Sequence, residues 1–304
     1  MPATNDNLHR ALRNKNDEFY TYLSDVEKEC AHYISYFSDK VIYCNTDDEN
    51  SAFWHYFVDN FENLGIKKVI ATHLESPQSY KLEYDGNSVI KTLLKGDGNY
   101  SSSECIEILD KVDIVVTNPP FSKSKEFITL IIEHNKDLLV IGNENAFSST
   151  LLFPLLKDHK IWTGYNKVKT FFTPTGETKD FGNICWFTNL PREEKPFIPL
   201  SKVYDETSYK RYENFDAINV DHLTDIPKDY AGVMGVPISL IGKYNPKQFE
   251  ILGLAAGNTK AHKLNYNVAY TPHPLDRGGC GIVEGQRKYT RVFVYLKILS
   301  LQSL

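Results

Sequence analysis

The chain lacks the features that mark membrane-spanning, disulfide-rich and zinc-binding proteins. None of its apolar runs approaches the roughly 18 residues that a membrane-spanning helix needs. Residues 1–15 are polar, so no signal peptide is expected. The five cysteines are typical of reduced thiols in a cytoplasmic protein, because no two of them form a Cys-x-x-Cys pair. They are Cys30, Cys44, Cys105, Cys185 and Cys280.

The chain also lacks an overall excess of positive charge. Its net charge is −5 at pH 7, which by itself gives no sign of a nucleic-acid partner. The distribution is uneven, because residues 240–304 carry nine Lys/Arg and three Asp/Glu, a local +6 that leaves −11 for residues 1–239. A basic segment on an acidic body is compatible with a nucleic-acid contact face. Charge alone favours the alternative, an ordinary solvated surface.

The 304 residues, 41% of them apolar, suffice for one large or two smaller globular domains. Strands and helices alternate over residues 17–157, which favours an α/β fold with a doubly wound parallel sheet. The predicted helices are 17–37, 51–64, 101–109, 123–133 and 148–157, and the predicted strands are 40–44, 68–71, 88–94, 112–117 and 137–141. Later segments predict a closing antiparallel hairpin (170–174 and 183–188), a linker (191–199), a helix (246–252) and a strand (289–296).

The most informative segment is the apolar run Val112–Thr117, which is followed by Asn118, Pro119, Pro120 and Phe121. Its β-branched residues predict a strand buried on both faces, and the prolines must end it because they cannot donate to a ladder. Ligands bind at this end of the strands in open α/β sheets. Asn-Pro-Pro followed by an aromatic residue resembles the catalytic motif of amino-methyltransferases, which move a methyl group from S-adenosylmethionine to a planar nitrogen. An ordinary loop after a strand is the alternative.

The chemistry explains why these residue types are needed. The lone pair of adenine N6 is delocalised into the ring, so this nitrogen is a poor nucleophile. Acceptors that grip both N–H bonds favour a more tetrahedral nitrogen, and the Asn118 side-chain oxygen and the Pro119 carbonyl can be that pair. Phe121 would stack on the face of the base. Positioning and electrostatics around an in-line displacement suffice, with no metal and no covalent intermediate.

Aromatic residues near the predicted first helix form a second candidate group. Phe19, Tyr20 and Thr21 resemble the N-terminal cofactor motif of amino-methyltransferases, which lines the methionine end of the cofactor. The alternative is that Phe19 and Tyr20 are core aromatics. This motif alone is weak support for a cofactor site.

Acidic residues follow the first two predicted strands. Asn45, Asp47 and Asp48 stand where a glycine-rich cofactor loop is expected, and no Gly-x-Gly is present. The two aspartates suit the ammonium group of a cationic cofactor, and capping of the next helix is the alternative. Glu75 follows the second strand, where an acid commonly accepts from ribose hydroxyls, and a solvated loop acid is the alternative.

Two further candidates lie on either side of the central motif. Asp97 follows the predicted third strand and is a candidate for the adenine amino group of the cofactor, with Gly98 allowing close backbone approach. A plain Asp-Gly turn is the alternative. Phe172, Trp186 and Tyr165 are candidates for the wall of a base pocket, with core packing as the alternative.

Together these residues resemble the EcoRI-type adenine-specific DNA methyltransferase family over most of the chain. The glycine-less segment 43–48 is the most distinctive part, because it is unlike most methyltransferases. The segments that carry the resemblance are 15–21, 37–41, 43–48, 63–65, 96–98, 102–104, 113–122, 183–190, 212–220 and 232–238. The resemblance implies a Rossmann-like class I methyltransferase sheet, mostly parallel with a terminal antiparallel hairpin, plus a smaller C-terminal α+β recognition region.

The implied activity is N6-methylation of adenine in double-stranded DNA by a monomer that flips the base out, because N6 is buried in the base pair. S-adenosylmethionine is the expected cofactor, without a metal. We expect residues 1–196 to form the cofactor-binding catalytic domain and residues 197–304 the target-recognition region. The expected setting is the cytoplasm of a bacterium, with a bacterial or phage gene, no membrane contact, and a cognate restriction endonuclease that shares the DNA site without touching the enzyme.

Two other functions stay open at this point. The same motif fits an amino-methyltransferase that acts on RNA adenine or on a protein glutamine, although the basic C-terminal segment disfavours glutamine. The missing glycine loop supports a catalytically silent DNA-binding protein.

Overall fold

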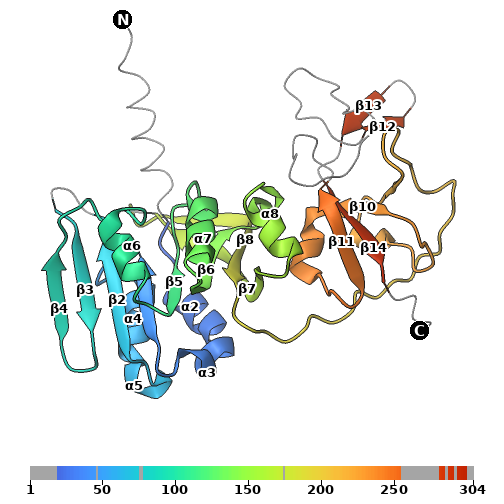
Figure 1. Ribbon diagram of the computed structural model, residues 1–304. Coiled ribbons are helices and arrows are strands. Elements are labelled where there is room, and N and C mark those ends of the chain that lie inside the picture. Colours follow the sequence, from blue (N-terminus) through green and yellow to red (C-terminus); the bar gives the residue numbers. More distant parts are fainter. Residues whose placement is uncertain are drawn as a thin grey trace, which may run out of the picture. The chain divides into compact units, whose positions relative to one another are not determined.

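The computed structural model describes residues 19–45, 47–74, 78–173, 175–254, 281–284, 287–290 and 293–299. The chain divides into two compact units, Met1–Ala146 with Ile161–Pro191, and Phe147–Lys160 with Arg192–Leu304. The first unit contains an eight-stranded sheet, and the second contains a four-stranded sheet and a two-stranded hairpin (Figure 1). Within the described residues, none of the helices has the length and apolarity that membrane crossing requires.

The large sheet has a parallel centre with antiparallel strands on both sides. Its strands are β1 (Val41–Asn45), β2 (Lys68–His73), β3 (Tyr80–Tyr84), β4 (Val89–Leu93), β5 (Ile114–Thr117), β6 (Asp137–Asn143), β7 (Trp162–Phe172) and β8 (Thr178–Thr188), in the order β4-β3-β2-β1-β5-β6-β8-β7. Strands β2, β1, β5 and β6 are parallel neighbours. The hairpin β7–β8 closes the sheet antiparallel to β6. The predicted α/β class and its terminal antiparallel hairpin are confirmed.

Helices of the first unit cover this sheet. They are α2 (Leu23–Cys30), the 3₁₀ turn η1 (Ala31–Tyr33), α3 (Ile34–Phe37), α4 (Ala52–Asp59), α5 (Phe61–Leu64), α6 (Ser103–Leu109) and α7 (Ser124–Glu133), and η2 (Glu144–Ser148) follows β6. Ser51 caps α4 by accepting from the Trp54 amide at 3.1 Å, and Gly65 ends α5 in the left-handed region at φ 63°. Local capping chemistry therefore sets these helix ends as the sequence predicted.

Strand β5 is buried on both faces, which explains its unbroken apolar sequence. Ile114 and Val116 join the core cluster that includes residues of α2 and α4. Because side chains alternate along a strand, Val115 points to the opposite face, where α7 contacts β6. All three side chains are fully buried. The strand that leads into Asn118 is thus held from both sides.

The first helix begins later than predicted. Helix α2 starts at Leu23, because Tyr20 pairs with Phe172 in an antiparallel bridge, with N···O distances of 2.8 and 2.9 Å in the two directions. Residues 19–22 are therefore extended along β7 instead of helical. Residues 17 and 18, with which the predicted helix begins, lie outside the described residues.

Strand β3 was not predicted. Tyr80 and Leu82 are buried and alternate with half-buried residues, and Asp85 and Gly86 supply the turn to β4, with Gly86 at φ 94°. Because β3 is antiparallel to β2 and β4, the strand before Lys95 is an exposed edge strand instead of a third parallel strand. The indication that the sequence analysis missed was the turn signal Asp85-Gly86, which follows the alternating residues of β3.

Ser101 and Glu104 have the spacing of a capping box at the start of α6, but the structure does not form one. Ser102 caps the helix by accepting from the Cys105 amide at 3.3 Å. Glu104 reaches outward and accepts from the amides of Lys95 and Gly96 at 2.9 and 3.1 Å. The glutamate therefore fixes the loop that contains Asp97, instead of closing its own helix.

The second unit is built on a small mixed sheet. Its elements are α8 (Leu152–Lys157), β9 (Ile218–Asn219), η3 (Leu223–Asp225), β10 (Met234–Pro237), η4 (Ile238–Lys243), β11 (Phe249–Leu254), β12 (Gly281–Glu284), β13 (Arg287–Thr290) and β14 (Phe293–Ile298), and the sheet order is β11-β14-β10-β9. The predicted helix at 246–252 is wrong, because Phe249 and Ile251 are buried while Glu250 is exposed, and β11 pairs with the distant β14. The predicted strand 289–296 is divided between β13 and β14.

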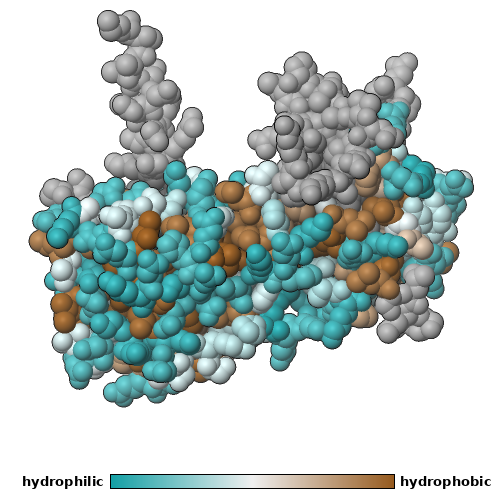
Figure 2. Space-filling model, viewed as in Figure 1, coloured by the Kyte–Doolittle hydropathy of each residue, from teal (hydrophilic) through white to brown (hydrophobic). Residues whose placement is uncertain are grey.

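The surface is mostly hydrophilic on the face shown in Figure 2, with hydrophobic residues visible between the hydrophilic ones. Scattered exposed apolar residues are normal on soluble domains. On the edge strand β4, Val89, Ile90 and Leu93 are each more than half exposed.

Candidate active site

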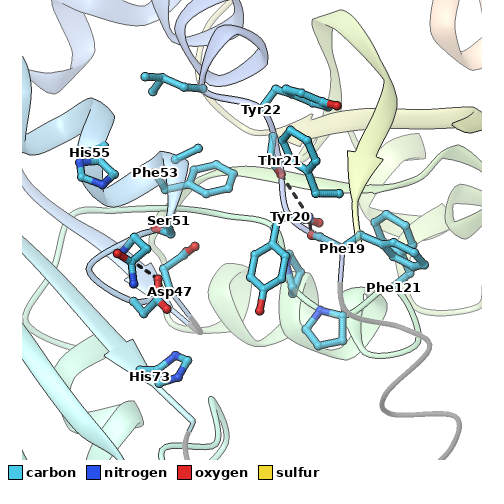
Figure 3. A pocket seen from close by; sticks show the side chains of 18 residues that line it. Phe19, Tyr20, Thr21, Tyr22, Asp47, Ser51, Phe53, His55, His73 and Phe121 are labelled. Atoms are coloured by element: carbon cyan, nitrogen blue, oxygen red, sulfur yellow. Dashed lines mark hydrogen bonds between the residues drawn. The ribbon is translucent and has the colours of Figure 1, made fainter. Parts of the chain in front are cut away.

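The carboxyl ends of three neighbouring parallel strands meet at one cavity of the first unit (Figure 3). Strands β2, β1 and β5 end there side by side, which is where open α/β sheets bind ligands. The cavity has a volume of about 600 Å³, within the range of cofactor sites. Its wall is formed by residues 19–23, 47, 48, 50–53, 55, 73, 118–121 and 172.

The Asn118 side chain has a fixed orientation. Its Nδ2 donates to the Phe19 carbonyl oxygen at 2.7 Å and to Thr21 Oγ1 at 3.2 Å. A carbonyl oxygen can only accept, so the amide nitrogen must face Phe19 and the amide oxygen must face away. Asn118 Oδ1 is buried and has no hydrogen-bond partner among the described residues. Asn118 lines the cavity, and its amide oxygen is an acceptor that none of the described residues satisfies.

The backbone around Asn118 is fixed by its neighbours. Thr117 Oγ1 lies 2.7 Å from the Asn45 carbonyl oxygen and 2.6 Å from Asp47 Oδ2, which ties the end of β5 to the end of β1. On the other side, the Lys123 amide donates to the Pro120 carbonyl oxygen at 2.8 Å as α7 begins. Pro119 is buried and Pro120 half-buried, and both line the cavity. The Asn-Pro-Pro segment thus joins strand to helix in a tight turn.

Asp47 places a carboxyl group on the same cavity. Burial raises the pKa of Asp47 to about 7, and hydrogen bonds from Thr117 and Ser51 partly offset this effect. A cation bound nearby would favour the ionised form. The neighbouring Asp48 also lines the cavity, and its Oδ1 accepts from the Asn50 amide at 2.9 Å. Ser51 supplies the side-chain cap of α4, and Asp47 contacts this capping serine.

Asn45 plays a different part from the two aspartates. It is buried and does not line the cavity. Its Nδ2 donates to Tyr43 Oη at 2.7 Å and to Thr72 Oγ1 at 3.0 Å, and these two oxygens lie 2.9 Å apart. The structure therefore places Asn45 in a buried network that joins β1 to β2.

Aromatic rings dominate the other end of the cavity. The rings of Phe19 and Phe121 stack with centroids 5.6 Å apart and an interplanar angle of 23°. Phe171 and Phe181 meet Phe121 edge-on at 5.7 and 5.6 Å. The Lys179 ammonium lies 5.0 Å from the centroid of the Phe19 ring. Phe121 is thus part of a four-ring cluster that keeps its position defined.

Other residues predicted for this region are placed as follows. Tyr20 and Phe172 line the cavity, and Tyr20 is 49% exposed. Thr21 also lines it and contacts Asn118. Trp186 does not line it. Trp186 is fully buried and packs edge-on against Phe53 with centroids 6.1 Å apart, so it is a core residue and not part of the base pocket that the sequence suggested.

Tyr165 is also outside the cavity. Its ring stacks on His32 at 4.0 Å, and its amide donates to the buried carboxylate of Glu29 at 2.8 Å. Because Tyr165 is 37% exposed, it is neither a core residue nor a cavity residue, and the core-packing alternative accounts for Trp186 alone.

The loop of Asp97 borders the site without lining it. Asp97 Oδ1 accepts from the Asn99 amide at 3.0 Å, and its carbonyl oxygen accepts from Ser79 Oγ at 2.6 Å. Gly98 has φ +73°, and a Cβ there would lie 2.9 Å from the His73 carbonyl oxygen. The glycine therefore permits the close approach of this loop to the end of β2. Glu75 lies outside the described residues.

Sequence reasoning missed His73. It is the last residue of β2 and lines the cavity. The strand was predicted to end at Ala71, so His73 was not placed at a strand end. Had the predicted strand been extended by two residues, His73 would have stood at its end.

The sheet order and the cavity at the carboxyl ends of β2, β1 and β5 define an α/β methyltransferase fold. The narrower identification comes from sequence comparison. The family model described as adenine-specific methyltransferase EcoRI matches residues 7–297, and the chain belongs to this family. No solved structure is significantly similar.

Three relatives match over most of their own length. The type II methyltransferase M.EcoRI of Escherichia coli is 40% identical over 300 residues, which cover 84% of this chain and 91% of that protein. A type II methyltransferase of Mycoplasma genitalium is 38% identical over 311 residues, with 94% and 98% covered. The type II methyltransferase M.MpnI of Mycoplasma pneumoniae is 34% identical over 312 residues, with 94% and 97% covered.

Proposed function

We propose that this chain is a DNA methyltransferase that transfers a methyl group from S-adenosylmethionine to N6 of an adenine in duplex DNA. The observation that carries the proposal is the unsatisfied Asn118 Oδ1, whose amide orientation is set by Phe19. Family membership and the type II methyltransferases among the relatives support the same activity. The target base must leave the helix, because N6 takes part in base pairing.

The cavity residues suit the cofactor. S-adenosylmethionine supplies an electrophilic methyl group on a sulfonium sulfur when it is bound. Asp47 and Asp48 offer carboxylates to its positive charges, and residues 19–21 line the space next to Asn118. Asp97 with Gly98 for the adenine ring, and Glu75 for the ribose, stay predictions from the sequence. The raised pKa of Asp47 fits a group whose ionised form is completed by a cation.

The protein's part in the reaction is to prepare the amine. Asn118 Oδ1 accepts one N–H of the target amine, and the Pro119 carbonyl accepts the other. These two acceptors localise the nitrogen lone pair and orient it, and the Asn118 amide is already oriented by its hydrogen bond to Phe19. Phe121 holds the ring of the base by stacking, which is sequence-tolerant and requires no polar contact.

The roles of the chain's parts follow from this proposal. The first unit carries cofactor binding and transfer, and residues 197–304 carry target recognition. The basic segment 240–304 supports a contact with DNA phosphates. A monomeric enzyme and a partner endonuclease that shares the DNA site are part of the same proposal.

The test is transfer of labelled methyl groups to three acceptors, namely unmethylated duplex DNA, structured RNA and protein. We expect label in DNA only, recovered as N6-methyladenine, and strongly reduced label with Asn118→Ala. Label in RNA or in glutamine would favour the other amino-methyltransferases. Binding of the cofactor without transfer to any acceptor would favour a silent DNA-binding protein.

A further inference from the structure

The hairpin of β7 and β8 continues past the end of the sheet as a two-stranded arm. Strand β6 ends at Asn143, which is opposite Ile184 of β8, whereas β7 and β8 remain paired as far as Phe172 and Thr178. Because β5 and β6 are parallel, the overhang lies beyond the same edge of the sheet at which Asn118 follows β5. The name hairpin arm is used below for residues 169–172 and 178–183.

The hairpin arm is anchored on the aromatic end of the cavity. Phe171 and Phe181 project from the arm and meet the Phe121 ring edge-on. Phe181 also meets the Phe19 ring edge-on, with centroids 4.9 Å apart. The arm therefore has a defined position next to the ring that, under the proposed function, stacks on the target base.

Lys179 places a cation on this arm. It is opposite Phe171 in the pairing of β7 with β8, and opposite residues of a strand pair project from the same face. The Lys179 side chain is exposed. Its ammonium lies 5.0 Å from the centroid of the Phe19 ring and 5.4 Å from that of Phe181. The positive charge is thus held beside the aromatic end of the cavity.

This charge is not neutralised by the acids around it. Glu177 and Asp180 are its neighbours in the chain, and neither forms an ion pair with Lys179 among the described residues. Asp180 instead accepts from Thr170 Oγ1 at 2.7 Å. Contacts of a cation with aromatic rings are worth only about 0.5–1 kcal/mol at exposed sites. They orient the ammonium and leave its hydrogen-bond donors available to an anion.

A DNA phosphate is the anion that suits this position. Lysine binds phosphate as a point charge, and a base stacked on Phe121 brings its own phosphates to this part of the surface, because they are one sugar away from it. The carboxylate of the cofactor is a less suitable partner, because Lys179 is not part of the cavity wall.

We propose that Lys179 binds a phosphate next to the flipped adenine, an inference that rests on the proposed function. The catalytic unit then contacts the DNA backbone itself, in addition to the basic segment 240–304. Phosphate contacts fix the position of a protein on a duplex without reading its sequence. Lys179 is therefore a positioning residue that holds the strand of the target base against the hairpin arm.

The salt dependence of DNA affinity tests the inference. It is measured between about 50 and 200 mM salt, on duplex DNA in which wild-type protein leaves its methyl label. Lys179→Met keeps an unbranched side chain over the rings and removes only the charge. The slope of log affinity against log salt is expected to fall by about 0.9, the value of one phosphate contact. Affinity is expected to fall about two- to fivefold, as for an exposed ion pair.

Two matched variants control for charge and for folding. Lys179→Arg keeps the charge and is expected to keep the wild-type slope. Lys111→Met removes an exposed lysine that precedes β5, at the opposite edge of the sheet, and is expected to leave slope and affinity unchanged. Calorimetry with S-adenosylhomocysteine is expected to give wild-type affinity for all three variants, which also shows that they are folded.

Neutral methylphosphonate linkages locate the contact. Each phosphate that flanks the methylated adenine is replaced in turn, and wild-type protein is expected to lose affinity at one linkage that costs Lys179→Met nothing further. A wild-type slope in Lys179→Met, or equal losses for both proteins at every linkage, overturns the inference alone. Weaker binding of S-adenosylhomocysteine by Lys179→Met with an unchanged slope overturns it too, and assigns the charge to the cofactor. Wild-type protein that does not methylate duplex DNA overturns the proposed function.

Discussion

The two ends of the cavity differ in how completely the protein satisfies its own groups. At the polar end, Asp47 has a raised pKa and His73 has a buried nitrogen without a partner among the residues described. At the aromatic end, Phe19 and Phe121 already stack on each other, with Phe171 and Phe181 around them. One end is electrostatically incomplete and the other is packed.

This difference separates two kinds of recognition. An incomplete polar end selects a ligand with matching charges and hydroxyls, because an imperfect ligand leaves buried polar groups unpaired. A packed aromatic end accepts a flat ring by stacking and discriminates weakly by itself. Asn118 lies where the two ends meet, since it bonds to Phe19 and follows Thr117, which contacts Asp47. The account therefore assigns the cofactor to the polar end and to residues 19–21, and the base to Phe121.

The largest expected effect comes from the residue between the ends. Asn118→Ala removes the acceptor Oδ1, and we expect methyl transfer to fall at least about 10²- to 10³-fold, the usual loss of one preorganised electrostatic contact. Asn118→Asp loses the hydrogen bonds that Asn118 donates to Phe19 and Thr21. Because it keeps an acceptor oxygen, it should retain more activity than the alanine variant. Single-turnover rates measure both. A wild-type rate in Asn118→Ala would remove Asn118 from the mechanism.

Removing the charge at the polar end is expected to weaken only the cofactor. Asp47→Asn keeps the shape and the hydrogen bond from Thr117, but it loses a charge-assisted contact of about 1.5–3 kcal/mol, or roughly 10- to 100-fold in affinity. Calorimetry with S-adenosylmethionine measures this loss. DNA binding should stay within twofold of wild type. Equal losses for both ligands would show that the two ends are not separate.

The same aspartate should make cofactor affinity depend on pH. Its pKa is raised from 3.8 to about 7, and a cationic ligand binds the ionised form better, so affinity should rise up to about tenfold per unit as pH rises toward 7. Its effect on folding has the opposite sign. The native state keeps a proton that the unfolded chain loses above about pH 4, so this group's contribution to unfolding free energy falls between pH 4 and 7. Asp47→Asn should flatten both profiles.

Removing the ring at the aromatic end is expected to weaken only the base. Phe121→Ala loses stacking worth about 1–3 kcal/mol, which should appear in the apparent affinity for DNA and in the transfer rate. Cofactor affinity should not change. DNA-binding measurements and calorimetry on the same protein preparation give the affinities for DNA and for the cofactor. A large loss of cofactor affinity would show that the Phe121 ring contacts the cofactor instead of the base.

The smallest effect on activity is expected for an aromatic residue that lies outside the cavity. Trp186→Phe leaves space in the core beside Phe53, so the free energy of unfolding should fall by about 1–3 kcal/mol. Transfer rate and both affinities, measured well below the melting temperature, should equal those of wild type. Denaturant unfolding and a transfer assay compare this variant with Phe121→Ala. A catalytic defect in Trp186→Phe would contradict its placement in the core.

The parts of this site that could be predicted are those set by local sequence. The apolar run before Asn118 and the prolines after it define a strand end, and Ser51 and Gly65 mark helix ends through their own chemistry. These signals need no knowledge of distant residues. The central motif was therefore recognised at the correct place in the sheet.

The parts that could not be predicted depend on partners far away in the chain. Asn118 is oriented by Phe19, 99 residues earlier, and β11 becomes a strand because β14 pairs with it. Periodicity cannot tell a cavity aromatic such as Phe172 from a core aromatic such as Trp186, because both lie in the same hairpin and both are apolar. Only the packed structure separates them.

The most direct test is a crystal structure of the full chain with S-adenosylhomocysteine. The account predicts the amino-acid end of the ligand at Asp47 and no part of the ligand stacked on Phe121. A ligand whose adenine stacks on Phe121 would contradict the assignment of the two ends.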